Sequence, residues 1–435
     1  MSYVSGAYIM TTNRCNLNCS YCYEKHRTGD MEWPVMKQLI DQLDSKWDPE
    51  RKCDNFCDIA LTMFGGEPML NWPIVKQAIE YAQTKKTRFG FYILTNGTIW
   101  TQEIHDFLAQ KKKEMCCRLM MQISVDGCER SHNETRKFAN GKGSYELVQA
   151  NAKKYHEIFQ DLIVRQTIVP ENIDHLLEDF CALASMAENI SMIPIYEGDW
   201  AKALPKAERE LDAIFWKYFE EQKVRPNLYL SLLNKVVMRA GDPTYKYKGC
   251  HAGKELIGVT TDGNIYPCHR FIAYREMFDY KLGDVWNWID QEGKNLAEID
   301  CAHFSQEKCQ ACTSRVCNRC YATNRLMGGD IAALPEQCYC DFAALNQKVV
   351  DKYSDRLVAV HKHTLVEWSV YKSPTSKRRA IQMANGEQIL AEDNQDLIVQ
   401  ALTKVLQQLK EISNQNHLIL LALKEQKEKN ANPVC

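Results

Sequence analysis

The distribution of cysteine constrains this chain more than any other feature of its sequence. The 435 residues include 19 cysteines, an odd number, and these gather in one group near residue 20 and another between residues 245 and 345. Disulfide-rich secreted domains are usually short and follow a signal peptide, whereas the opening MSYVSGAYIMTTNRC has no basic segment followed by an apolar one. The pattern therefore predicts a cytoplasmic protein whose reduced cysteines bind metal.

The overall composition is that of an ordinary globular protein, with 45% hydrophobic and 25% charged residues. Its length suggests two to three domains of roughly 150 residues each. The net charge is −2, from 54 Lys and Arg against 56 Asp and Glu, which gives no electrostatic support for nucleic-acid binding. No stretch approaches the roughly 18 apolar residues of a membrane-spanning helix. Neither a nucleic acid nor a membrane is therefore expected as a partner.

The first 230 residues alternate short apolar runs with segments of helical pattern. The predicted strands cover 6–12, 58–64, 90–95, 119–125, 162–169 and 190–196. Between them, segments such as 33–47 and 74–84 place apolar residues at helical spacing. Repeated strand-then-helix units imply parallel strands, so an α/β barrel or an open α/β sheet is predicted. Ligands of such folds lie at the carboxyl ends of the strands.

Cys15, Cys19 and Cys22 form the segment CNLNCSYC directly after the first predicted strand, with gaps of three and two residues. Three thiolates from one short loop can bind three irons of a 4Fe-4S cluster and leave the fourth iron without a protein ligand. Zinc is the alternative, but a closed zinc site needs four ligands, usually from paired Cys-x2-Cys arms. The segment therefore favours a reactive iron-sulfur centre.

This loop resembles the signature of radical S-adenosylmethionine (radical SAM) enzymes, Cys-x3-Cys-x2-Cys with an aromatic residue, here Tyr21, before the third cysteine. Gly65, Gly66 and Glu67, with a proline after them, end the second predicted strand and resemble the family's Gly-Gly-Glu-Pro motif, which contacts the amino group of the methionine moiety. Glycines also suit a backbone that must approach a ligand closely. The resemblance implies a partial (β/α)6 TIM-type barrel over residues 1–230 that binds S-adenosylmethionine.

Two further strand ends fit this resemblance. Thr95 and Asn96 close the third predicted strand, and Ser124 and Asp126 lie at the end of the fourth. In the family, such segments line the ribose and carboxylate side of the cofactor pocket. Arg136 is a candidate partner for the methionine carboxylate, because a guanidinium can bind a carboxylate through two hydrogen bonds. At each of these positions a structural turn or salt bridge is the alternative.

The resemblance also implies the chemistry. Transfer of one electron to S-adenosylmethionine chelated at the open iron yields a 5'-deoxyadenosyl radical, which removes an unactivated hydrogen from the substrate. The cofactor performs this step, and the protein positions the substrate and excludes water.

Residues 245–345 are rich in cysteine and loops. A hairpin is predicted from 256 to 268 with its turn at 262–264, and Cys250 and Cys268 flank it. Four cysteines follow with gaps of two, four and two residues, and a further one comes after seventeen residues. A structural zinc ribbon is the alternative for this run. The pattern predicts a second, metal-organised domain.

The array resembles the SPASM domain, which carries auxiliary 4Fe-4S clusters in radical enzymes that modify peptides and proteins, although two gaps are one residue shorter than usual. The resemblance implies two auxiliary clusters, hence three 4Fe-4S clusters in all. The outer would be held by Cys309, Cys312, Cys317 and Cys338, and the inner by Cys250, Cys268 and Cys320. The inner cluster would then have an open iron for a substrate thiolate, unless Cys301 or Cys340 fills or exchanges a position.

Residues 346–435 are predicted to form a helical C-terminal extension. Apolar residues recur at helical spacing on one face of 395–412, at Ile398, Leu402, Val405, Leu406, Leu409 and Ile412. A helix packed on its own chain is favoured, and a homodimer seam or a peptide-docking helix are the alternatives.

The choice among SPASM-type functions depends on one position. Sulfatase-maturating enzymes place their catalytic aspartate directly after the cysteine that closes the hairpin, where this chain has His269. The preferred function is therefore maturation of a ribosomally synthesised, cysteine-containing precursor peptide by thioether crosslinks from sulfur to a carbon, as in sactipeptide and ranthipeptide maturases. Carbon–carbon crosslinking or sulfatase-type maturation is the alternative. A non-enzymatic iron-sulfur or zinc protein is disfavoured by the Gly-Gly-Glu-Pro motif.

These expectations leave several roles open. The electron donor would be a protein such as flavodoxin or ferredoxin. Only fourteen residues precede Cys15, so the core, the C-terminal helices or a separate protein would recognise a leader peptide. No residue is assigned as a catalytic base from the sequence.

Overall fold

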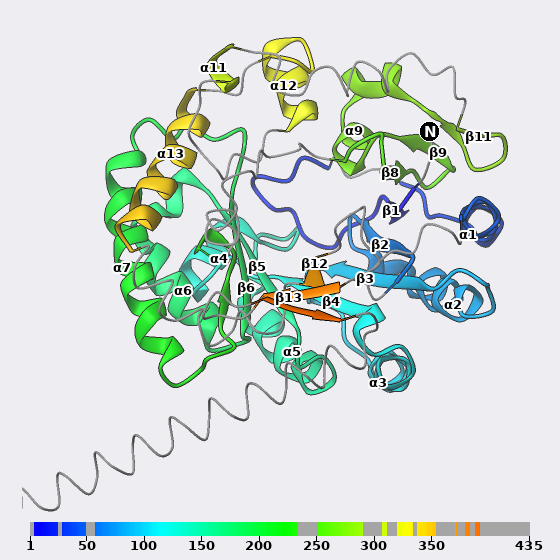
Figure 1. Ribbon diagram of the computed structural model, residues 1–435, viewed down its shortest axis with the longest axis horizontal. Coiled ribbons are helices and arrows are strands. Elements are labelled where there is room, and N and C mark those ends of the chain that lie inside the picture. Colours follow the sequence, from blue (N-terminus) through cyan, green and yellow to red (C-terminus); the bar gives the residue numbers. More distant parts are fainter. Residues whose placement is uncertain are drawn as a thin grey trace, which may run out of the picture. The chain divides into compact units, whose positions relative to one another are not determined.

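The computed structural model describes residues 4–24, 28–48, 57–233, 251–289, 307–310, 320–333, 337–353, 370–371, 379–382 and 388–391. These fall in two compact units, Met1–Lys352 and Tyr353–Cys435. The first unit contains an 11-stranded sheet in the order β11-β10-β9-β8-β1-β2-β3-β4-β5-β6-β7 (Figure 1).

The centre of this sheet is the predicted set of parallel strands. They are β1 (Gly6–Thr12), β2 (Ile59–Gly65), β3 (Phe89–Thr95), β4 (Leu119–Ser124), β5 (Ile163–Ile168), β6 (Asn189–Pro194) and β7 (Tyr229–Leu230). Each pairs in parallel with the next. Because β1 pairs on its other side with β8 and not with β7, the barrel is open. The predicted α/β partial barrel is confirmed.

Helices connect these strands and cover the outer face of the sheet (Figure 1). They are α1 (Trp33–Ser45), α2 (Trp72–Ala82), α3 (Gln102–Met115), α4 (Glu129–Thr135), α5 (Tyr145–Ile158), α6 (Leu176–Ala184) and α7 (Leu204–Gln222), with short 3-10 turns η1 (Pro68–Asn71), η2 (Cys116–Arg118) and η3 (Pro170–His175). The start of α3 shows why such a segment becomes helical. The Thr101 hydroxyl caps it by accepting a hydrogen bond from the Ile104 amide at 3.2 Å.

Alternation along the strands separates an outer face from an inner one. In β5, Val164, Gln166 and Ile168 are buried, and the intervening residues are half-buried. Gln166 donates a hydrogen bond of 2.6 Å to Asp179 of α6, so the buried face is the one under the helices. The alternate residues of β5, Arg165 among them, therefore face the interior of the barrel.

A second set of elements extends the sheet beyond β1. The strands are β8 (Leu256–Val259), β9 (Asn264–Tyr266), β10 (Gly283–Asp284) and β11 (Trp288–Ile289), and the helices are α9 (His269–Ala273), η4 (Arg275–Tyr280), α11 (Glu307–Gln310), α12 (Tyr321–Gly328) and α13 (Gln337–Lys352). β8 and β9 are antiparallel, which confirms the predicted hairpin. At its turn Gly263 has a φ of +87°, a conformation that glycine adopts without strain.

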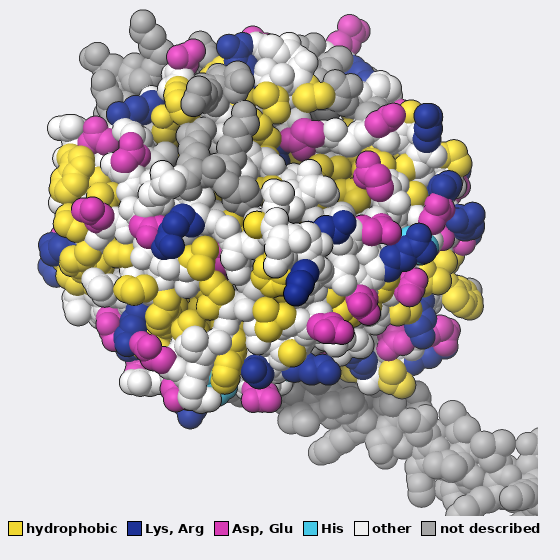
Figure 2. Space-filling view, turned by 180° about the vertical axis from the view of Figure 1, so that it is seen from behind, with side chains coloured by type: hydrophobic (Ala, Val, Ile, Leu, Met, Phe, Trp, Pro, Cys, Tyr) yellow, Lys and Arg dark blue, Asp and Glu magenta, His cyan; other side chains and the backbone are white. Residues whose placement is uncertain are grey.

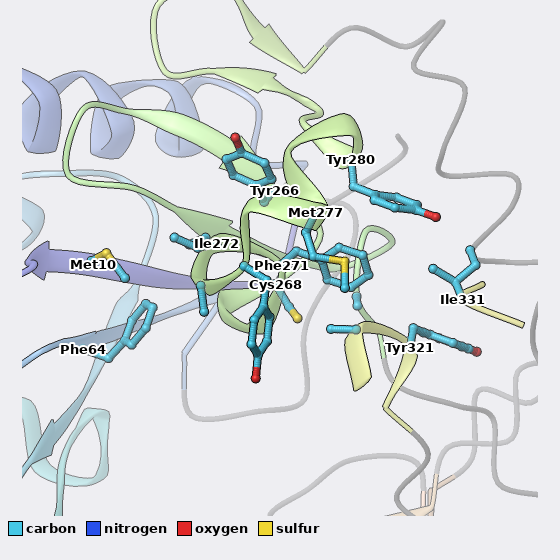
Figure 3. Close-up of a cluster of buried hydrophobic side chains, with 14 residues drawn as sticks. Met10, Phe64, Tyr266, Cys268, Phe271, Ile272, Met277, Tyr280, Tyr321 and Ile331 are labelled. Atoms are coloured by element: carbon cyan, nitrogen blue, oxygen red, sulfur yellow. The ribbon is translucent and has the colours of Figure 1, made fainter. Parts of the chain in front are cut away.

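A buried hydrophobic cluster joins these elements to the barrel. Met10 of β1 and Phe64 of β2 gather with Cys268, Phe271 and other side chains from η4 and α12 (Figure 3). The boundaries drawn from the sequence at residues 230 and 245 thus fall inside the first compact unit. The cysteine-rich region is built onto the carboxyl side of β1 and β2.

The surface of the first unit carries charges of both signs. Lys and Arg are interspersed with Asp and Glu on the face shown in Figure 2. Several pair across elements, such as Lys348 of α13 with Glu208 of α7 at 2.7 Å. Exposed pairs of this kind contribute little to stability.

In the second unit the described residues form a three-stranded antiparallel sheet of β12 (Val370–Tyr371), β13 (Arg379–Gln382) and β14 (Gln388–Ala391), which the sequence analysis does not anticipate. The helix predicted over 395–412, and with it the proposed dimer seam, lies outside the described residues. No helix in the described part of the chain is long and apolar enough to cross a membrane.

Candidate functional site

The three-cysteine loop follows β1 at the carboxyl end of the sheet. Backbone hydrogen bonds fix its path, from the Asn18 amide to the Lys137 carbonyl at 2.7 Å and from the Ser20 amide to the Thr135 carbonyl at 2.9 Å. Leu17, within the loop, is buried. The loop is therefore held by the segment after β4, and its three cysteines are half-buried or exposed as whole residues.

The thiols of this loop resist ionisation in the absence of a bound metal. Burial raises the pKa of Cys15 to about 12 and that of Cys22 to about 11, and burial also raises the pKa of Cys19. No group of three or more Cys, His, Asp or Glu among the described residues could hold one metal ion. A cubane differs from such a site because each cysteine binds a different iron. Three thiols on one ordered loop fit that donor requirement.

The glycine pair at the end of β2 lies directly against the cysteine loop. Gly65 has a φ of +144°, and a Cβ atom there would lie 2.2 Å from the Thr12 carbonyl oxygen. A Cβ on Gly66 would lie 2.2 Å from the Arg14 carbonyl oxygen. The Glu67 amide donates to that same oxygen at 2.8 Å. Side chains at either glycine would push the two segments apart, so the motif has a demonstrable steric role here.

Glu67 is fully buried and joins the ends of β2 and β3. Its carboxyl oxygens accept hydrogen bonds from the Asn96 amide at 2.6 Å, the Thr95 hydroxyl at 2.8 Å and the Met69 amide at 3.0 Å. Burial raises the pKa of Glu67 to about 7, and the donors around it limit the rise. The Asn96 side chain in turn lies 3.8 Å from the Cys15 sulfur. Glu67, Thr95 and Asn96 are therefore brought together beside the cysteine loop.

A second buried carboxylate organises the other side of the loop. Asp126 accepts hydrogen bonds from the Tyr21 hydroxyl at 2.6 Å, from Arg136 Nε at 3.0 Å and from the Thr167 amide at 3.0 Å. Arg136 Nη1 lies 3.7 Å from the Cys19 sulfur. Burial alone would lower the pKa of Arg136, but Asp126, Tyr21 and Cys19 raise it. The structure thus gives Tyr21 and Asp126 a positioning role toward Arg136 and the cysteine loop.

Ser124 ends β4 beside this network. It is half-buried and in register with Arg165 of β5. All nine positions predicted to bind S-adenosylmethionine lie at the last residues of β2, β3 and β4 or in the segments that follow β1 to β4. Their contacts with the cofactor remain a prediction.

The second cysteine array is described only in part. Cys268 is buried at the start of α9, and Cys320 and Cys340 are half-buried at α12 and α13. Cys309 and Cys338 lie on α11 and α13, and their side chains are outside the description. Cys250, Cys301, Cys312 and Cys317 lie outside the described residues. The two auxiliary clusters therefore stay a prediction.

Sequence analysis singled out His269 but not the polar group around it, which links β1, the cysteine loop and α9. Tyr8 stacks on His269 with ring centroids 4.3 Å apart, and the Tyr23 ring lies 6.2 Å from the same imidazole. Arg270 is ion-paired with Glu197, which follows β6, and donates to Thr323 of α12 at 2.9 Å. Burial lowers the pKa of His269 to about 3. Polar residues at inward positions of apolar strands, such as Tyr8, were the available signal.

These features define a class of enzyme: a parallel, open α/β barrel with three cysteines after its first strand and a Gly-Gly-Glu turn after its second. Residues 9–183 match the radical SAM superfamily. The tungsten-containing aldehyde ferredoxin oxidoreductase cofactor-modifying protein of Pyrococcus furiosus is 33% identical over 67% of this chain and 79% of its own length. This chain therefore belongs to the radical SAM superfamily, and membership implies S-adenosylmethionine and a 4Fe-4S cluster.

Two other similarities are relevant. The sporulation killing factor maturation protein SkfB of Bacillus subtilis is 26% identical over 70% of this chain and 66% of its own length. The solved structure of anSMEcpe with bound AdoMet and the Kp18Cys peptide matches with a TM-score of 0.65 at 17% identity, over 81% of this chain and 98% of that one. This structural likeness concerns the fold. The chain spans 43% and 65% of the length of two other relatives, both archaeal.

Proposed function

We propose that this protein is a maturase of a ribosomally synthesised peptide that joins a cysteine sulfur of the peptide to one of its carbons. The main support for radical S-adenosylmethionine chemistry is the contact of the Gly65–Gly66 turn with the cysteine loop. The name of the relative SkfB and the peptide in the anSMEcpe complex support the substrate class. The cysteine-rich region beside β1 supports a reaction at sulfur.

Different residues would hold the iron-sulfur cluster and S-adenosylmethionine. Cys15, Cys19 and Cys22 would hold the cluster, and the Gly65–Glu67 turn would approach the methionine amino group. Bound S-adenosylmethionine supplies the 5'-deoxyadenosyl radical on reduction. Asp126 holds Arg136 by its Nε and so keeps the guanidinium beside Cys19, where its remaining donors can meet a carboxylate.

The cysteine-rich region would serve the substrate side. Cys268 lies in the same hydrophobic cluster as Phe64, and Cys320 packs against that cluster. Both were assigned to an inner auxiliary cluster with one open iron, which would bind the substrate thiolate. The electron donor would be flavodoxin or ferredoxin.

The decisive experiment is anaerobic reconstitution with iron and sulfide, followed by iron counting and an assay for 5'-deoxyadenosine after addition of dithionite and S-adenosylmethionine. About twelve irons per chain and release of deoxyadenosine are expected for three cubanes. Cys15→Ala, Cys19→Ala and Cys22→Ala should each abolish release while about eight irons remain. Cys181→Ala, an exposed cysteine of α6, is the control and should behave as wild type. Release by all three loop variants would contradict the assignment.

Carbon–carbon crosslinking and sulfatase-type maturation remain the second candidates, because the same cofactor residues would serve them. A thiol requirement separates carbon–carbon crosslinking from thioether formation, and sulfatase-type maturation of a cysteine is separated by its product, which loses the sulfur that a thioether keeps. A thioether maturase consumes a cysteine peptide with loss of two hydrogens, and its serine counterpart is not crosslinked. Mass spectrometry of both peptides after turnover distinguishes the reactions.

A further inference from the structure

In the part of the chain that the structure describes, the interior of the barrel contains one arginine without a counter-ion. Arg165 lies near the middle of β5 on the half-buried, inward face, in register with Ser124 of β4 and Ser191 of β6. Among the residues that the structure describes, its guanidinium forms no ion pair and no hydrogen bond. Taking a cation out of water is costly unless an anion accompanies it.

The other two arginines of this region are already neutralised. Arg136 is paired with Asp126 at 3.0 Å, and Arg270 is paired with Glu197. Arg136 acts on the groups of the cysteine loop, since its charge lowers the pKa of Cys19 and Tyr21. Arg165 is therefore the one of these three arginines that has no ion-pair partner among the described residues.

One described carboxylate, Glu24, acts on Tyr23 together with Arg165, but no described carboxylate forms an ion pair with Arg165. The field of Arg165 reaches Tyr8 of β1, Tyr92 of β3 and His269 of α9. Burial raises the pKa of both tyrosines, so their hydroxyls are neutral. The Tyr92 hydroxyl donates to Gln122 at 2.8 Å. His269 Nδ1 is buried and has no hydrogen-bond partner in the described structure, which adds a second unsatisfied polar atom to the same group.

We propose that Arg165 binds a carboxylate of the substrate inside the barrel, and that the substrate peptide therefore carries an aspartate or glutamate near the residue that is modified. This inference rests on the proposed peptide substrate. The planar guanidinium matches a carboxylate through two hydrogen bonds, whereas a cysteine thiolate offers it no such geometry. The carboxylate of S-adenosylmethionine is assigned to Arg136, on the side of the cysteine loop.

The test uses the reconstituted full-length enzyme with S-adenosylmethionine and three amidated or free tripeptides. Titration calorimetry compares acetyl-Ala-Asp-Ala-amide with acetyl-Ala-Asn-Ala-amide, and acetyl-Ala-Ala-Ala with a free carboxyl terminus distinguishes a side-chain carboxylate from a terminal one. Wild type should prefer the Asp over the Asn peptide by about tenfold, as expected for a charge-assisted hydrogen bond. Arg165→Gln should abolish this preference. Arg209→Gln, the same exchange on the exposed face of α7, should keep it.

Arg165→Lys keeps the positive charge but not the paired donors of the guanidinium, so it should retain a reduced preference for the Asp peptide. This variant covers the case in which Arg165→Gln does not fold. Equal affinity of wild type for the Asp and Asn peptides would overturn the inference, and so would an unchanged preference in Arg165→Lys or Arg165→Gln. A preference of wild type for acetyl-Ala-Ala-Ala would mean that Arg165 binds the carboxyl terminus of the peptide and not an aspartate or glutamate side chain. Weaker binding of S-adenosylmethionine in Arg165→Gln, with peptide preference intact, would assign Arg165 to the cofactor. Failure of the proposed function is separate, because mass spectrometry would then find no thioether in a cysteine peptide after turnover, whatever the affinities for the tripeptides.

Discussion

Two sides of the same barrel interior differ in how their polar groups are satisfied. Beside the cysteine loop, Asp126 and Glu67 are fully buried and each accepts hydrogen bonds from several donors. On the side of β5 and α9, Arg165 has no described counter-ion and His269 Nδ1 has no described partner. Both sides are polar, but the two buried carboxylates of the first already have their hydrogen-bond partners without a ligand.

The difference separates positioning from recognition. A satisfied network fixes backbone and side chains before a cofactor arrives, because each buried polar group already has its partners. Unsatisfied donors destabilise the free protein, and a ligand that satisfies them gains affinity. We therefore expect substitutions on the cysteine-loop side to cost stability, and substitutions on the β5 side to cost substrate binding instead.

Asp126→Asn should give the largest effect. The exchange keeps the shape but leaves Arg136 as an unpaired buried charge, which typically costs about 3–5 kcal/mol. Anaerobic urea unfolding and the affinity for S-adenosylmethionine would both report the loss. Asp174→Asn removes an exposed partner of Lys206 and should change stability little. Equal losses in the two variants would remove the distinction between the sides.

Gly66→Ala should follow, with a loss of about 3 kcal/mol, because its Cβ would meet the backbone of the cysteine loop and cannot be accommodated by a side-chain rotation. Gly141→Ala is the control. Its φ is +82°, but no atom lies within 4 Å of the added Cβ, so only the backbone strain of about 1 kcal/mol applies. Thermal unfolding of both variants measures the difference. A Gly66→Ala protein as stable as Gly141→Ala would show that the two segments do not need their close contact.

Glu67, on the cysteine-loop side, should make the stability of the protein depend on pH. Its folded pKa of about 7 exceeds the ordinary 4.5, so the folded protein binds more protons than the unfolded chain between these values. Stability should therefore fall as pH rises from about 4.5 to 7, by roughly 2 kcal/mol from this residue. Glu67→Gln cannot titrate and should lose less stability over this window. Urea unfolding at pH 5 and pH 7.5 tests this, and parallel losses in both proteins would contradict it.

The sequence predicted the cysteine-loop side well and the β5 side poorly, for a physical reason. Cys15, Gly66 and Glu67 follow strands whose ends meet at one edge of the sheet, so strand prediction alone places them together. Arg165 and His269 come from elements separated by about a hundred residues, and only the pairing of β1 with β8 brings α9 against the barrel. The role of Asp126 was missed for a related reason. Its hydrogen bonds to Tyr21 and Arg136 depend on tertiary contacts that spacing does not reveal.

The smallest effect on stability is expected from Arg165→Gln. An unpaired, half-buried cation contributes no ion pair to the fold, so its removal should change the free energy of unfolding by less than about 1 kcal/mol and can even raise it. The matched exchange Arg136→Gln removes a paired, buried guanidinium and should cost at least about 3 kcal/mol, because Asp126 is left without its cation. Anaerobic urea unfolding of the two variants at one pH measures both changes. A loss in Arg165→Gln as large as that in Arg136→Gln would mean that Arg165 stabilises the barrel itself, and the β5 side would then be a structural network like the one beside the cysteine loop.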